Sequence, residues 1–202
     1  MVSIRSLTAV SLASFLFWPL AVLAVTSSTV VDNFAALKAK SIALQDPAQN
    51  VNLINAYLFI AGLGPIPSLI SQYKEFIVLT DGLNAAYLGS PPFTSSDATA
   101  ATIPSAFRAF IVEHSILLNI LIGNAGVVNP VPGVGVLPPL NTAMGTVLSA
   151  GRTALETYTA RIVALTDATA DFQIQESWTG INTTYNVAYD FYRNSIVTDV
   201  LG

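Results

Sequence analysis

The sequence predicts an all-α fold, a single bundle of about five to six helices with a proline-kinked central helix. Apolar residues recur three or four positions apart along every long segment, and residues 140–165 carry a seven-residue apolar repeat. No segment of comparable length alternates apolar and polar residues as a half-buried strand does. Because no composition shift marks a boundary, residues 25–202 are expected to form one domain.

Residues 1–24 are predicted to be a secretory signal peptide. Arg5 supplies a positive charge, residues 7–20 form an apolar run, and the run at 22–24 precedes an expected cleavage site after Ala24. The alternative interpretation is a membrane anchor, but the flanking residues favour cleavage. We therefore expect a secreted protein.

The first two helices are predicted on either side of a proline. Residues 29–45 place apolar side chains on one helical face. Asp46 then suits an N-cap and Pro47 suits the first helical position, so the first helix is expected to stop there and a second to begin. Gly62 and Gly64 are expected to end the second helix.

Helical spacing resumes over residues 65–87, and the Gly-Ser-Pro-Pro run at 89–92 is expected to end that helix. Another helix is expected to begin at Thr94. Pro104 should bend or restart it, because proline lacks a backbone donor and crowds the preceding turn. Residues 107–122 are apolar around most of their circumference and predict the most buried helix.

The segment 123–139 interrupts the helical pattern with four prolines and four glycines. It is interpreted either as a loop packed across one end of the bundle or as a flexible apolar lip over a cavity. The heptad pattern of 140–165 then predicts a long helix that packs in a bundle. A last helix is expected over 168–196, and the residues expected to face inward are Ile174, Trp178, Ile181, Tyr185, Ala188 and Tyr192.

Composition restricts the function. The chain is 52% hydrophobic and 10% charged, whereas ordinary soluble domains carry about 25% charged residues. A net charge of −4 provides no positive field for nucleic acid. The absence of cysteine excludes disulfides, thiol nucleophiles and thiolate metal sites. The apolar runs at 51–69 and 107–128 are interrupted by glycine and proline or by charged residues, so no transmembrane span is expected.

No catalytic residue, metal site or cofactor is expected. His114 is the only histidine, and it adjoins Glu113, so the two side chains do not face each other on a helix. We interpret His114 as a structural or solvent-edge residue. The carboxylates are scattered without metal-ligand clustering. Asn182 begins the single Asn-X-Thr sequon and is the candidate glycosylation site.

The apolar surplus predicts a non-catalytic binder of apolar, fatty-acid-like ligands. Helical bundles hold ligands between facing helices. Core packing is the plain alternative for each inward aromatic residue. The candidate ligand-binding residues all fall on predicted inward faces, and they are Tyr73, Phe76, Phe107, Phe110, Leu117, Leu148, Leu155 and Tyr158.

Several segments resemble one family in their layout: Val31-Asp32-Asn33-Phe34 in the first helix, the Pro92-to-Asp97 run, Pro104 before an apolar run, and a heptad helix ending at Leu165-Thr166. Together with the leader, they resemble the fungal hydrophobic-surface-binding protein A and antigenic cell-wall galactomannoprotein family. The resemblance implies a secreted or cell-wall-associated helical bundle. Such a bundle would bind fatty acids, or coat a hydrophobic solid surface and recruit a secreted hydrolase there.

Two departures from the family pattern put the shape of any cavity in question, namely the segment 123–139 and the aromatic last helix. Two other functions also fit the sequence. One is a structural or antigenic glycosylated cell-wall protein with a fully packed core and no ligand. The other is a surfactant-like protein that opens at interfaces.

Overall fold

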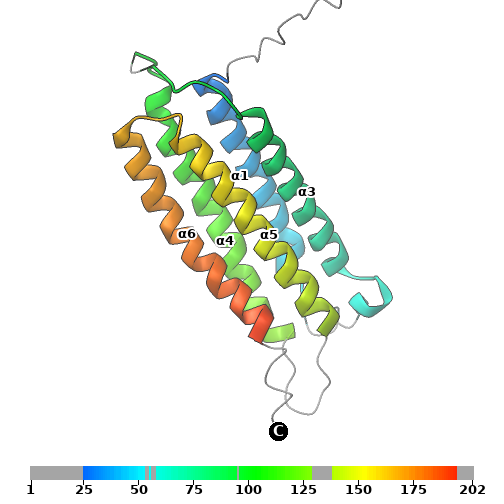
Figure 1. Cartoon of the computed structure of the whole chain (residues 1–202). Coiled ribbons are helices and arrows are strands. Elements are labelled where there is room, and N and C mark those ends of the chain that lie inside the picture. The colour runs from blue at the N-terminus through cyan, green and yellow to red at the C-terminus, as the bar shows by residue number, and fades with distance from the viewer. Residues whose placement is uncertain (1–24, 53–54, 56–57, 95, 129–137, 195–202) are drawn as a thin grey trace, which may run out of the picture.

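Figure 1 shows the computed structural model of the chain, which describes residues 25–52, 55, 58–94, 96–128 and 138–194. These residues form five long α-helices and two short 3-10 turns, with no strand among them, which confirms the predicted all-α bundle. In chain order the elements are α1 (Ser27–Gln49), η1 (Phe59–Ala61), α3 (Pro65–Ala86), η2 (Ala100–Thr102), α4 (Ile103–Val128), α5 (Pro138–Val163) and α6 (Ala168–Asn194).

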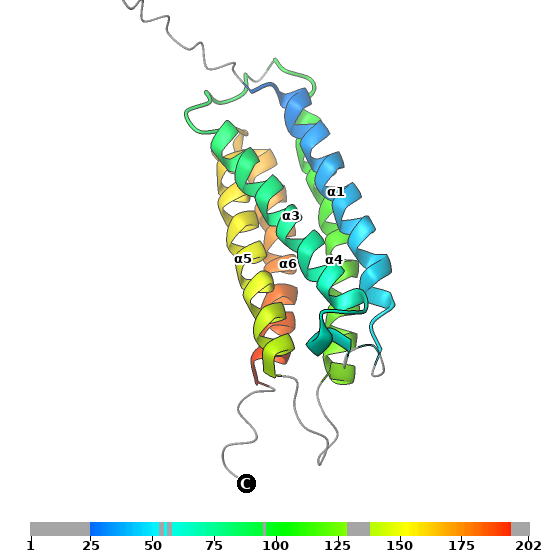
Figure 2. The ribbon, with the colours of Figure 1, turned by 90° about the vertical axis from the view of Figure 1, so that its right-hand side faces the viewer.

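The five helices form a closed ring in the order α1, α4, α6, α5, α3, in which α3 returns to α1. Each helix makes its main contacts with its two neighbours in that order, as the two views in Figures 1 and 2 show. Helices that pack 8–10 Å apart on a pentagon leave a centre roughly 8 Å from each axis. Large side chains are therefore needed to fill the middle of the ring.

α1 does not stop where the sequence predicted. It runs through Pro47 to Gln49, so the predicted helix boundary at Asp46 is wrong. Pro47 lies in the last turn and removes one backbone hydrogen bond, but continuing the helix buries Ala48 completely. Asn124 of α4 also donates its side-chain N–H to the carbonyl of Ala48 at 2.6 Å, and this carbonyl accepts the backbone N–H of Val51 at 3.1 Å as well.

Of the two glycines predicted to end the second helix, only the first ends an element. Gly62 follows η1 with a φ of 71°, and Gly64 precedes α3 with a φ of 85°. Both values lie in the left-handed region that glycine adopts without steric cost.

Pro104 is the second residue of α4, so the structure does not show the predicted kink inside a central helix. In the first turn of a helix the backbone N–H has no intrahelical partner, and proline costs nothing there. No helix begins at the predicted Thr94, and Asp97 instead accepts hydrogen bonds in the turn that leads into η2. The carboxylate of Asp97 accepts from the backbone N–H of Thr99 at 2.9 Å and from the Ser27 hydroxyl at 2.6 Å.

The segment 123–139 was predicted to lie outside any helix, and this is wrong at both ends. α4 continues to Val128, and α5 begins at Pro138. The extra turn of α4 buries Ala125 and carries Asn124, which donates to the carbonyl of Ala48. Residues 129–137 lie outside the described part, so the choice between a packed loop and a lip is not tested there.

The two C-terminal helices confirm the predicted inward faces. Leu148, Leu155 and Ile162 of the heptad seam on α5 have no exposed surface. On α6, Ile174 and Tyr185 are equally buried.

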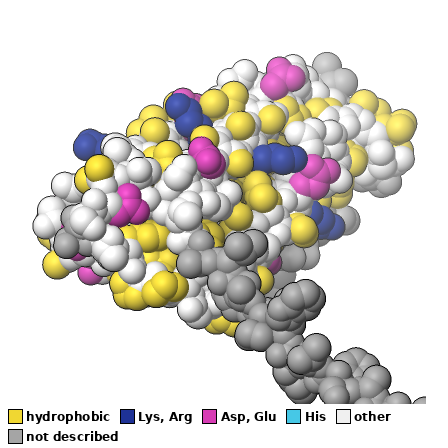
Figure 3. All heavy atoms as spheres, turned by 90° about the horizontal axis from the view of Figure 1, so that it is seen from above, with side chains coloured by type: hydrophobic (Ala, Val, Ile, Leu, Met, Phe, Trp, Pro, Cys, Tyr) yellow, Lys and Arg dark blue, Asp and Glu magenta, His cyan; other side chains and the backbone are white. Residues whose placement is uncertain are grey.

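The surface carries few charges, and its hydrophobic side chains are scattered among polar ones on the face shown in Figure 3. One described stretch, Ala100–Ala125, is long and apolar enough to cross a bilayer by length and composition. This stretch consists of η2 and most of α4, which packs against α1 and α6. The absence of a membrane span stays a prediction. The signal peptide and its cleavage after Ala24 concern residues 1–24, which lie outside the described part.

Candidate functional site

The structure brings the predicted ligand-binding residues together inside the ring. All eight have no exposed surface, and α3, α4 and α5 supply them: Tyr73, Phe76, Phe107, Phe110, Leu117, Leu148, Leu155 and Tyr158. The prediction that these side chains face inward is confirmed. Their contact with a ligand stays a prediction.

The aromatic members of this set pack against one another. The ring centroid of Phe110 lies 6.3 Å from that of Phe76 and 6.2 Å from that of Phe107. Phe34 of α1, which the sequence did not single out as a site residue, joins them at 5.2 Å from Phe107 and 5.6 Å from Tyr158. Such pairs add about 0.5–1.5 kcal/mol beyond area burial. These rings fill this part of the core.

A small apolar crevice lies in the core at the opposite end from the start of α1. Its volume is about 10 Å³, which is roughly the space for one water molecule. The crevice is lined by Val51, just after α1, and by residues of α3, α4, α5 and α6. These residues are Ile66, Leu69, Leu121, Asn124, Leu140, Met144 and Tyr192. This crevice is far smaller than an acyl chain.

A polar cluster occupies the middle of the ring. The Tyr185 hydroxyl lies 2.5 Å from His114 Nε2 and 2.8 Å from the Tyr73 hydroxyl. Ser41 Oγ lies 2.8 Å from His114 Nδ1 and donates to the carbonyl of Leu37 at 2.9 Å. The cluster therefore links α1, α3, α4 and α6 through residues that are all buried.

One set of hydrogen-bond directions gives every proton in the cluster an acceptor. In this set Ser41 donates to the carbonyl of Leu37, so His114 Nδ1 carries a hydrogen and donates to Ser41. His114 Nε2 then accepts from the Tyr185 hydroxyl, and that oxygen accepts from Tyr73. Every proton in the cluster has an acceptor, so the cluster is satisfied without a ligand.

Burial keeps the cluster uncharged. Desolvation lowers the pKa of His114 to about 3 and raises the pKa values of Tyr73 and Tyr185. We predicted His114 to be either a structural residue or a residue at the solvent edge. Its complete burial makes it a structural residue.

The remaining helix of the ring, α5, contributes a glycine beside this cluster. A Cβ added to Gly151 of α5 would lie 2.6 Å from Cε1 and 3.2 Å from the hydroxyl of Tyr73. Gly151 therefore allows the Tyr73 ring to approach the backbone of α5. The seven-residue repeat over residues 140–165 gave no sign of this close approach.

The remaining candidates lie apart from the core. Asn182 is half-buried on α6, and its side-chain oxygen accepts from Arg152 Nε at 2.7 Å. Its glycosylation stays a prediction. In the described part of the chain, no three His, Asp or Glu side chains come close enough to hold a metal ion.

No protein-family model and no curated protein matches this sequence. Among solved structures, the Aspergillus fumigatus protein AfMP4p in complex with palmitic acid is similar, with a TM-score of 0.68. The similarity covers 83% of this chain and 99% of that chain, at 11% sequence identity. The chain shares the fold of AfMP4p. The predicted family resemblance is supported at the level of fold, and family membership stays a prediction.

Proposed function

We propose that this protein is a secreted, non-catalytic binder of a fatty acid or a similar long-chain ligand, which it holds between the helices of its ring. The observation that carries the proposal is the fold shared with AfMP4p, whose structure contains palmitic acid, over 99% of the length of that chain. The inward-facing leucines and aromatic residues on α3, α4 and α5 supply the apolar surroundings that an acyl chain requires.

Burial of an acyl chain can meet the cost of binding. A dozen methylenes gain about 10 kcal/mol when they leave water. Association and the movement of core side chains reduce this gain. We expect a dissociation constant of about micromolar or weaker.

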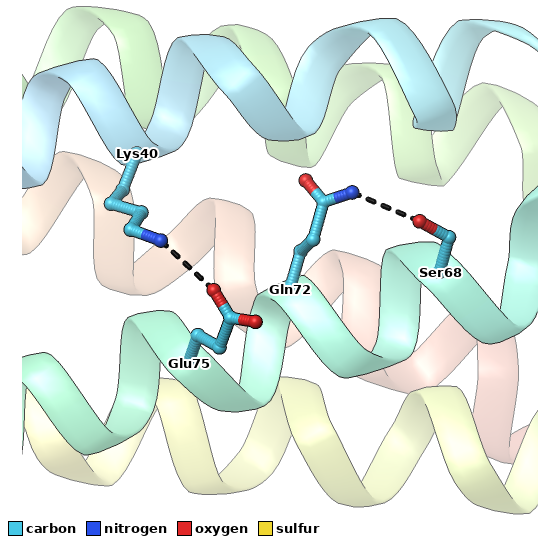
Figure 4. Close-up of polar contacts among 4 residues, drawn as sticks. All are labelled: Lys40, Ser68, Gln72 and Glu75. Atoms are coloured by element: carbon cyan, nitrogen blue, oxygen red, sulfur yellow. Dashed lines mark hydrogen bonds and ion pairs between the residues drawn. The ribbon is translucent and has the colours of Figure 1, made fainter.

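The ligand needs a route into a core that is filled, and we place that route between α1 and α3. This is the least extensive of the five helix–helix contacts in the ring. An exposed ion pair joins the two helices, with Lys40 Nζ and Glu75 Oε2 2.9 Å apart (Figure 4). Exposed ion pairs contribute only about 0–1 kcal/mol, so separating α1 from α3 costs less than opening the other contacts.

The polar contact beside this ion pair does not join α1 to α3. Gln72 donates to Ser68 at 2.9 Å, and both residues belong to α3 (Figure 4). Their hydrogen bond therefore adds nothing to the contact between the two helices.

A second candidate function follows from the packed aromatic residues. A core that is filled by Phe34, Phe76, Phe107 and Phe110 favours a structural or antigenic cell-wall protein that binds no ligand. The two proposals differ in whether the ring opens.

Native mass spectrometry with palmitic acid separates the two proposals. The protein is freed of lipid with organic solvent, refolded and mixed with palmitic acid. Binding predicts a one-to-one adduct, and an apoprotein that ignores excess palmitic acid favours the structural alternative.

A pair of variants shows where the ligand lies. Leu148→Trp fills the core and is expected to abolish the adduct. Val78→Trp adds the same group on an exposed position of α3 and should preserve the adduct. Circular dichroism checks that both variants fold, and an adduct that survives in a folded Leu148→Trp variant contradicts binding inside the ring.

A further inference from the structure

A wide groove runs along the outer face of α5, between α3 and α6, and it is separate from the core. Its volume is about 810 Å³, within the range of small-molecule sites. α3 contributes Ile77, Asp81 and Asn84, and α6 contributes Tyr189 and Arg193. The floor comes from α5 and consists of Asn141, Thr142, Gly145, Thr146, Ser149, Ala150, Thr153, Ala154 and Thr157.

The floor presents hydrogen-bond acceptors. Thr146, Thr153 and Thr157 each donate the hydroxyl proton to the carbonyl four residues earlier, at 2.8, 3.1 and 2.9 Å. Their protons are thereby engaged, and their oxygens keep lone pairs for a partner. All three residues are exposed. The groove thus suits a ligand that brings its own hydroxyl donors.

Asn141 is the feature that points to a ligand. It lines the groove with only 1% of its surface exposed, and neither its side-chain nitrogen nor its side-chain oxygen has a partner in the structure. Buried polar atoms without partners are costly and rare in folded proteins. Asn84 adds a second unpaired oxygen, while its nitrogen donates to the carbonyl of Ala154 at 3.1 Å.

The walls favour a neutral ligand with an apolar face. Asp81 and Arg193 bring one charge of each sign, so no net charge selects an anion or a cation. The guanidinium of Arg193 lies 5.9 Å from the ring centroid of Tyr189. Gly145 lies beside this ring, because a Cβ there would be 3.9 Å from Tyr189 Cε2. Because Gly145 has no side chain, the groove stays open beside the Tyr189 ring.

We propose that this groove binds a neutral oligosaccharide. Sugar hydroxyls both donate and accept, so they match the threonine oxygens and both amide atoms of Asn141. The C–H face of a pyranose suits the Tyr189 ring. A protein partner would require an apolar centre with large anchoring side chains. The groove offers Ile77 and a floor of small residues in place of such a centre.

The test is an amide chemical-shift titration of the full chain with linear hexasaccharides of mannose, glucose and N-acetylglucosamine. We expect at least one of them to shift the amides of residues 141–157 and 189–193 selectively. If none shifts these amides at millimolar concentration, the proposal is wrong. Shifts of the same amides on addition of palmitic acid, or on raising the protein concentration alone, assign the groove to lipid or to a second copy and also overturn it.

Asn141→Leu separates a binding role from a structural one. The variant keeps the branched shape and removes both unpaired amide atoms, so it should raise the melting temperature while weakening hexasaccharide binding at least tenfold. Gly145→Leu should block binding, and Gly180→Leu, outside the groove, should not. Gly180 has nothing within 4 Å of an added Cβ. Unchanged binding in both groove variants contradicts the proposal.

Discussion

A single buried histidine holds together helices that are far apart in the sequence. His114 contacts Ser41 of α1 and Tyr185 of α6, and Tyr185 contacts Tyr73 of α3. Gly151 of α5 provides the space for Tyr73. A half-satisfied buried network is more costly than an apolar core. This cluster therefore favours the one register of the five helices in which every hydrogen bond is made.

Acid should weaken this cluster. The pKa of His114 is about 3 in the fold and about 6.5 in the unfolded chain. Between these values the unfolded state binds more protons, so the free energy of unfolding falls as the pH drops from 6.5 to 3. The total loss from this residue is on the order of 5 kcal/mol.

Urea denaturation at pH 7, 5 and 3.5 measures this loss, with His114→Gln as the comparison. The variant should be less stable at pH 7 and should show a flatter pH dependence than the wild type. Because the carboxylates titrate in both proteins, the difference between the two curves isolates His114. Parallel curves would show that His114 does not titrate with a lowered pKa.

Gly151 and Gly180 provide a matched pair. Alanine at 151 would place its Cβ 2.6 Å from Cε1 of Tyr73, so Gly151→Ala is expected to lower the free energy of unfolding by about 1–3 kcal/mol. Gly180 is a helical glycine with open space around it, so Gly180→Ala should stabilise α6 by about 0.5–1 kcal/mol. Thermal denaturation tests both, and equal shifts in the two variants contradict the packing at Tyr73.

At the scale of elements, the sequence predicted α3, α5 and α6 nearly to their ends. It failed at the ends of α1 and α4, and one contact explains both failures. Asn124, in the unpredicted turn of α4, donates to the carbonyl of Ala48, in the unpredicted turn of α1. Pro47 and Gly123 each weaken a helix locally, but the tertiary contacts of the extra turns outweigh this local cost. Spacing along the sequence does not show such a contact.

In the candidate site, too, the sequence predicted one part and missed another. Helical periodicity placed all eight candidate residues in the core correctly. It did not predict the hydrogen bonds among Ser41, Tyr73, His114 and Tyr185, since these residues come from four separate helices. The lone histidine on an apolar helix was the one signal that a buried polar partner exists.

The contact between α1 and α3 can be locked chemically. A carbodiimide joins an amine and a carboxylate that lie in contact, and Lys40 Nζ and Glu75 Oε2 are 2.9 Å apart. If α1 and α3 separate to admit the ligand, the linked protein should take up palmitic acid at least tenfold more slowly. Stopped-flow fluorescence of the tryptophans provides the rate, and peptide mass analysis verifies the link.

Lys40→Gln, which cannot form the link, is the control. Its uptake rate should be the same with and without carbodiimide. Equal rates for the linked and unlinked wild type place the route elsewhere in the ring.

At the scale of the whole molecule, the five helices form a ring, and the fold is similar to that of AfMP4p with a TM-score of 0.68. The wide centre of the ring needs large side chains or a ligand to fill it. In the described part, aromatic rings fill most of this centre and leave a crevice of about 10 Å³. We therefore expect bound and free forms to differ in the rotamers of these rings.

The central claim is that an acyl chain lies inside this ring, and intermolecular nuclear Overhauser effects from ¹³C-labelled palmitic acid test it most directly. We predict contacts to the methyl groups of Leu117, Leu148 and Met144, all of which are buried. Contacts confined to exposed side chains such as Val78 and Phe172, or no contacts at saturating palmitic acid, would contradict the claim.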